Sequence, residues 1–148
     1  MYYNARELAQ TVEVDAGAHI RDVIKGVATD GVCPEDEWPY DASKFAQKPP
    51  NKCYTDALKY RTIEYQRLSR ILNQMKGCLA SGDPFIFGFT VYENFETDVT
   101  TTGHLSMPTS HSKQPDVLGG HCVLAVGYDD LQNHFIAYQQ DQYHYREG

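Results

Sequence analysis

The sequence lacks the basic clusters and the long apolar runs that are typical of proteins that bind nucleic acids or membranes. Its 13 Lys and Arg residues are outnumbered by 20 Asp and Glu residues, and they form no cluster that would attract phosphates or anionic lipid. No apolar run approaches the ~20 residues of a membrane-spanning helix. Residues 1–10 also lack the basic-then-apolar order of a signal peptide. We therefore expect a protein that binds neither nucleic acid nor membrane.

Cysteine is scarce as well, with four residues in the chain. They include no Cys-x-x-Cys pair, and the histidines lack metal-ligand spacing, so we expect no metal and no cofactor. One disulfide at most, between Cys33 and Cys53, suits the sequence, because proline-rich turns between them could bring the two ends together. Free, buried thiols suit the sequence at least as well.

The first half of the chain has mainly helical patterns. Apolar residues at helical spacing predict a helix over 16–29, and the prolines in 33–52 predict an ordered loop. A short helix is expected over 55–61 and a strand over 62–69, where apolar residues alternate. Helical spacing returns over 70–82.

The second half has strand patterns. Phenylalanines alternate within 84–95, and two short apolar runs at 121–130 and 134–138 predict adjacent antiparallel strands. Residues 97–118 are polar and without periodicity, which predicts a long loop. Helices followed by strands indicate an α+β fold, with helices packed against one antiparallel sheet.

Common hydrolase motifs are missing, including Gly-x-Ser-x-Gly and His-Glu-x-x-His. One histidine, His121, precedes an apolar run, and Cys122 follows it. Side chains alternate across a strand, so these two neighbours cannot form a base and nucleophile pair. If the imidazole faces a cleft, the thiol is expected to face the packed side of the sheet. A hydrogen-bonded or exposed histidine without catalytic role is the plainer interpretation.

Several segments resemble one family. The run GGHCVLAVGYDD is similar to the histidine strand of papain-like cysteine peptidases, in which small and apolar residues and then Val-Gly-Tyr follow the catalytic His. The segments DGVCPEDEWPYD, PPNKCYTDALKY and PFIFGFTVYENF also resemble that family, in its order, so the likeness covers residues 1 to about 136.

This resemblance implies a papain-like α+β fold, in which a partial helical domain precedes an antiparallel β-barrel-type domain. We expect one incomplete domain over 1–148, mainly helical over 1–82 and mainly β over 83–148. The resemblance assigns His121 as the catalytic general base and places Gln139 where the family has the Asn that orients this base. The implied substrate-binding positions are Ala16, Gly17, Gly120 and Cys122.

The family's nucleophile is a Cys that opens a helix shortly after a Gln, and we expect that none of the four cysteines of this chain has that role. The resemblance therefore implies the C-terminal part of a cysteine-type endopeptidase, acting on peptides or proteins but inactive alone. The alternative is a non-catalytic papain-like module that binds a peptide or protein. Without the helix that bears the nucleophile, apolar surface would be uncovered, which predicts self-association or a complementing N-terminal segment.

Overall fold

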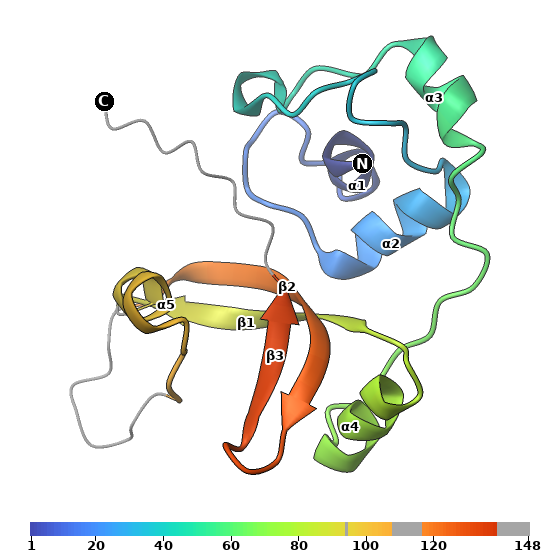
Figure 1. Ribbon diagram of the computed structural model, residues 1–148. Coiled ribbons are helices and arrows are strands. Elements are labelled where there is room, and N and C mark those ends of the chain that lie inside the picture. The colour runs from blue at the N-terminus through green and yellow to red at the C-terminus, as the bar shows by residue number, and fades with distance from the viewer. Residues whose placement is uncertain (94, 108–116, 139–148) are drawn as a thin grey trace. The chain divides into compact units, whose positions relative to one another are not determined.

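The chain forms two compact units, Met1–Arg67 and Leu68–Gly148 (Figure 1). The residues that the computed structural model describes are 1–93, 95–107 and 117–138. None of the helices in these ranges is both long and apolar enough to cross a membrane. The division at residue 67 places the helix predicted over 70–82 with the strands. The expectation of one incomplete domain stays a prediction.

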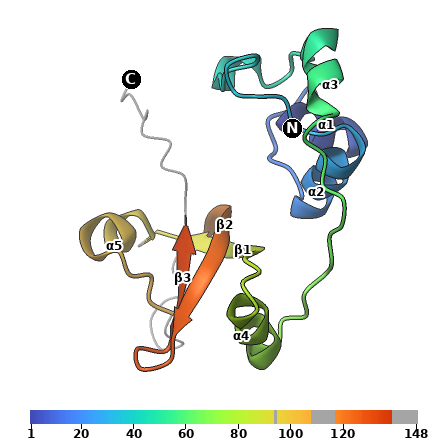
Figure 2. The ribbon, with the colours of Figure 1, turned by 45° about the vertical axis from the view of Figure 1, so that its right-hand side comes forward.

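The first unit is built on helix α1 (Tyr2–Leu8), which packs against helix α2 (Ile20–Thr29) (Figure 2). The sequence predicted α2 but placed its start at residue 16, four residues too early. Gly17 explains the difference, because its φ of +77° lies in the left-handed region and cannot belong to a right-handed helix. In the segment before α2, Asp15 accepts a hydrogen bond from the Tyr2 hydroxyl of α1.

Helix α3 (Asn51–Ala57) completes the first unit, together with a short 3-10 helix (Ala42–Lys44). The prediction of a helix over 55–61 was wrong at both ends, because the chain becomes helical directly after Pro50 and the helix ends at Ala57. The ring fixes the φ of Pro50 at −65°, and this residue has no N–H that would need a partner at the helix end. The strand predicted over 62–69 does not form.

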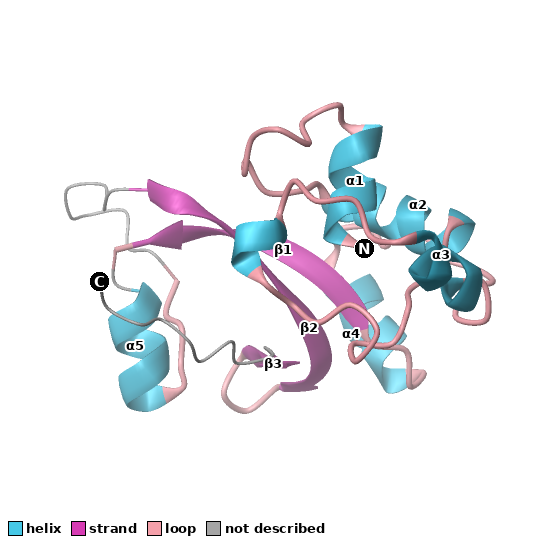
Figure 3. Cartoon of the chain, turned by 90° about the horizontal axis from the view of Figure 1, so that it is seen from above, coloured by secondary structure: helices cyan, strands magenta, loops and turns pink. Residues whose placement is uncertain are grey.

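The second unit contains a three-stranded antiparallel sheet in the order β1-β2-β3 (Figure 3). The strands are β1 (Phe85–Tyr92), β2 (Val117–Asp129) and β3 (His134–Tyr138), and helix α4 (Leu72–Ala80) packs against β2. The sequence predicted all four elements, but β2 begins four residues before the predicted start, within the segment expected to be a loop, and β1 ends at Tyr92 rather than at residue 95. The mixed α+β class is confirmed, whereas the described strands form an open sheet, so a barrel is not confirmed.

Strand β2 is the central strand of this sheet and pairs with both of the others. Its N-terminal part pairs with β1, and its C-terminal part pairs with β3. The pairing with β3 steps from Ala125 to Gly127, which leaves Val126 as an extra residue. Such a bulge locally bends and twists a strand, and it separates the part of β2 that carries His121 from the β2–β3 hairpin.

The prediction of a structureless loop over 97–118 was wrong in its first part, where the chain forms helix α5 (Phe95–Thr102). Phe95 and Val99 are both half-buried, and their i,i+4 spacing places them on one face of a helix. A pair of apolar residues within a Thr-rich segment is too weak a pattern to be recognised in the sequence. Residues 108–116 lie outside the described part of the chain.

Candidate functional site

His121 lies on the covered face of the sheet. Strand pairing places it directly opposite Phe89 on β1, and two residues further on Val123 is opposite Phe87. Val123 is buried, while Phe87, Phe89 and His121 are half-buried. Because directly opposed residues of antiparallel strands share a face, the imidazole joins the row of apolar side chains along β1 and β2.

Two phenyl rings hold the imidazole. The centroid of the Phe89 ring is 5.7 Å from that of His121, with the ring planes at 89°, and the Phe95 centroid is 5.5 Å away. The same two phenyl rings also contact each other, at 5.6 Å between centroids. This tilted and edge-to-face packing fixes the orientation of the imidazole without occupying either of its nitrogen atoms.

The Nε2 atom of His121 is buried and has no hydrogen-bond partner among the described residues. Buried polar atoms are nearly always paired, so an unpaired one calls for an explanation such as a functional role. An imidazole in a sheltered position, with one nitrogen available, can accept a proton from a nucleophile and return it to a leaving group. The geometry of His121 is therefore compatible with a general base.

Cys122 lies on the other face of β2, so the expectation that neighbours cannot pair as base and nucleophile holds. The expectation about its side was wrong: Cys122 is exposed, and the imidazole is on the more covered face. Partial burial of its sulfur still raises the pKa of the Cys122 thiol. A nucleophilic thiol needs a lowered pKa instead.

The remaining three cysteines are all free thiols in structural surroundings. The thiol of Cys78 donates to the carbonyl oxygen of Asp83 at 3.3 Å, and that of buried Cys53 donates to the carbonyl oxygen of Glu37 at 3.8 Å. Burial, followed by a hydrogen bond with Cys53, raises the pKa of the Cys33 thiol. The Cys33–Cys53 disulfide that the sequence left open is absent from this structure.

The predicted substrate-binding residues are distributed over both units. Ala16 and Gly17 are exposed in the segment before α2, whereas Gly120 lies on β2 directly before the histidine. A side chain added at Gly120 would meet only the carbonyl oxygen of Phe89, at 3.9 Å. The binding roles of these residues stay predictions, and Gln139 lies outside the described residues.

Sequence reasoning missed the two phenylalanines that surround His121. Phe89 was recognised as part of a strand, but its position opposite His121 depends on the register between β1 and β2. Phe95 was assigned to the end of a strand, whereas it begins helix α5. No three His, Cys, Asp or Glu side chains gather as a metal site anywhere in the described ranges.

No family model matches the chain. It is similar, with 40% identity over 145 residues, to an uncharacterised peptidase C1-like protein of Acanthamoeba polyphaga mimivirus, and the match covers 92% of this chain and 46% of that protein. It is also similar to the crystal structure of xylellain, a cysteine protease from Xylella fastidiosa, with a TM-score of 0.75 and 39% identity. That match covers 90% of this chain and 54% of xylellain, so the chain spans about half the length of these relatives.

Proposed function

We propose that this chain supplies the general base for a cysteine-type endopeptidase. It belongs to the papain-like cysteine peptidases and spans about half the length of the two relatives named above. The observation that carries this proposal is the sheltered Nε2 atom of His121, which has no partner among the described residues. The rings of Phe89 and Phe95 keep the imidazole in one orientation. This is what proton transfer at a fixed position requires.

The proposed chemistry is peptide-bond hydrolysis by a Cys/His pair. The imidazole takes the proton of a cysteine thiol, and the resulting thiolate attacks the carbonyl carbon of the peptide bond. The imidazolium then gives its proton to the leaving amine, and a water molecule later hydrolyses the acyl-enzyme with the same imidazole as base. His121 would make both transfers.

We propose that the residues of this chain alone do not complete the reaction. Two thiols have raised pKa values, and Cys122 faces away from His121. Cys53 lies in the first turn of α3, six residues after Gln47, but its thiol is buried and donates to the carbonyl oxygen of Glu37. None of the other three cysteines begins a helix. For the fold, we propose that β1, β2 and β3 belong to a closed barrel, because β1 and β3 have unpaired outer edges within the described residues.

The test compares two proteins in a fluorogenic peptide assay under reducing conditions. The chain alone should show no turnover, and a longer product of the same gene, read from the coding region upstream of Met1, should show thiol-dependent turnover. In that longer protein, His121→Ala should abolish turnover, and the matched control Cys122→Ser should retain it. Turnover by the chain alone that survives replacement of each cysteine in turn would contradict the proposal.

Binding separates the catalytic proposal from the non-catalytic one. Isothermal titration of the longer protein with extended peptides measures affinity independently of turnover. Binding with turnover supports the peptidase. Binding that persists in the absence of any turnover, even under reducing conditions, supports a non-catalytic module and overturns the proposed general base.

We further propose that the isolated chain self-associates or accepts a complementing segment through the sheet. Ile86, Ile136 and Tyr138 are 49%, 49% and 60% exposed, and exposed apolar strands favour pairing with another chain. Size-exclusion chromatography should report a species larger than a monomer. A compact monomer that binds no apolar dye would argue against this proposal.

A further inference from the structure

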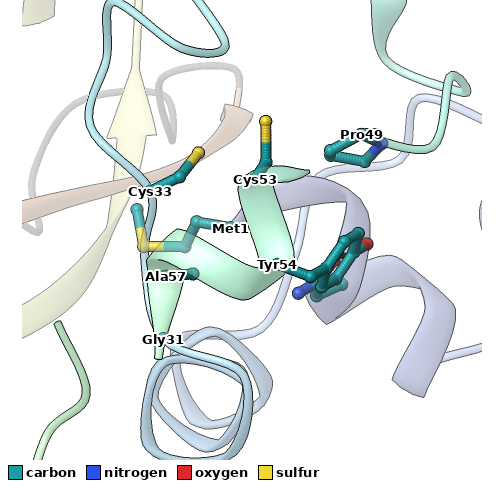
Figure 4. A pocket seen from close by; sticks show the side chains of 8 residues that line it. Met1, Gly31, Cys33, Pro49, Cys53, Tyr54 and Ala57 are labelled. Atoms are coloured by element: carbon teal, nitrogen blue, oxygen red, sulfur yellow. Dashed lines mark hydrogen bonds between the residues drawn. The ribbon is translucent and has the colours of Figure 1, made fainter. Parts of the chain in front are cut away.

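The first unit contains a small pocket, of about 20 Å³, into which two cysteine side chains project (Figure 4). Cys33 comes from the segment after α2, and Cys53 comes from α3. Figure 4 shows the two sulfur atoms near each other on the same side of α3. All the residues that line this pocket belong to the first unit, whereas His121 belongs to the second.

The backbone next to Cys33 is fixed against the helix that carries Cys53. Gly31 approaches α3 so closely that a Cβ atom there would lie 1.9 Å from the carbonyl oxygen of Ala57. One residue later, the amide of Val32 donates to the carbonyl oxygen of Tyr60 at 3.2 Å. These two constraints hold the segment in place, so the approach of the two thiols does not depend on side-chain rotamers alone.

The two thiols differ in access. Cys53 is 4% exposed, and its sulfur is engaged with the carbonyl oxygen of Glu37. Cys33 is half-buried and lines the same pocket as Cys53. A reagent from solution therefore reaches Cys33 first, and Cys53 is placed to react second.

We propose that Cys33 and Cys53 form a thiol–disulfide site that is closed by a small-molecule disulfide such as oxidised glutathione. The Cys33 thiolate attacks one sulfur of oxidised glutathione, which forms a mixed disulfide and releases one glutathione thiolate. The Cys53 thiolate then attacks the Cys33 sulfur of the mixed disulfide and releases the second glutathione. Two protein thiols are oxidised, one glutathione disulfide is reduced, and the two protons pass to the released glutathione.

Closure has two measurable consequences. Thiol–disulfide exchange requires a thiolate, and the pKa of Cys33 is raised by burial and by Cys53, so closure should be slow at neutral pH and faster at pH 9. The new bond would close the loop between residues 33 and 53. Closure of a loop of this size is expected to raise the Tm of the first unit by roughly 20 °C.

The experiment uses the whole chain in the background Cys78→Ser/Cys122→Ser, so that only the proposed pair can react. After incubation with oxidised glutathione, thiol titration and intact mass should show no free thiol and no bound glutathione. A non-reducing peptide map should contain one peptide pair linked through Cys33 and Cys53. Free thiols throughout, stable glutathione adducts or links between chains would overturn the proposal.

Single variants assign the order of attack. In Cys53→Ser, the resolving thiol is missing, so Cys33 should retain one glutathione. In Cys33→Ser, buried Cys53 should remain free. The reverse pattern would overturn the assigned order. Because serine variants of the pair can destabilise the unit, the linked peptide and the Tm increase are also measured in the unsubstituted chain, where an absent linked peptide overturns the proposal.

Discussion

Replacement of Arg6 by Met should destabilise the first unit more than any surface substitution. Arg6 belongs to α1 and is fully buried. Its guanidinium donates to the carbonyl oxygen of Phe45 at 2.9 Å, to that of Thr11 at 2.7 Å, and also to those of Val12 and Val14. One side chain thereby fixes the turn after α1 and joins it to the loop before α3.

The magnitude follows from these contacts. A hydrogen bond to a charged group contributes roughly 1.5–3 kcal/mol, and a buried acceptor left without a donor costs about 1–3 kcal/mol. The carbonyl of Val14 belongs to an exposed residue and regains water, whereas Thr11, Val12 and Phe45 are half-buried. We assume that about two of these three half-buried carbonyl oxygens find no water partner after the substitution. On that basis, we expect Arg6→Met to lower the free energy of unfolding by about 3–5 kcal/mol.

Urea unfolding followed by circular dichroism measures this loss. Arg6→Lys keeps the charge but not the planar fork of donors, so it should recover only part of the stability. The matched control is Arg21→Met, on the exposed face of α2, with an expected change within about 0.5 kcal/mol. A loss below 1 kcal/mol for Arg6→Met, or a loss equal to that of the control, would refute the reasoning.

Two other perturbations test the first unit. Gly31→Ala would place a Cβ atom 1.9 Å from the carbonyl oxygen of Ala57, at a φ of +80°, and should lower the free energy of unfolding in urea by about 2–4 kcal/mol. Gly17→Ala, at a φ of +77° but with no atom within 4 Å of the added Cβ, should lower it by only about 1 kcal/mol. Equal losses in the two variants would contradict the steric argument. Burial raises the pKa of Tyr54 from 10.0 to about 12, and its hydroxyl donates to Asn4 at 2.8 Å. The stability that the neutral phenol contributes is fully present below pH 10 and is lost as the pH rises through about 12. The urea midpoint should therefore decline less over this pH range in Tyr54→Phe than in the unsubstituted chain. An equal decline in both proteins would exclude Tyr54 as its cause.

The sequence predicted the elements that depend on local periodicity. The alternation from Phe85 along β1 was sufficient, because the large aromatic side chains recur at every second residue and lie on the more covered face of this strand. The same reasoning failed over 62–69, where Ile63 is fully exposed and no strand of the described residues pairs with this segment. Alternation indicates a strand only where a partner is present, and the partner is not encoded locally.

For the candidate site, the sequence located His121 but not its surroundings. Strand periodicity correctly separated the imidazole from Cys122. It could not reveal that Phe89 and Phe95 enclose the ring, because this contact combines the β1–β2 register with a helix of weak pattern. Which face is more covered also depends on tertiary packing, and this explains the wrong expectation for Cys122.

The extra residue in β2 bears on how this protein can vary. Pairing with β1 sets the position of His121 and runs without interruption from Phe85 to Val91, while the step at Val126 affects only the β3 side. Insertions or deletions in the turn between β2 and β3 can therefore be absorbed beyond Val126. The β2–β3 hairpin can therefore change in sequence and length without moving His121, whose position depends on the pairing of β2 with β1.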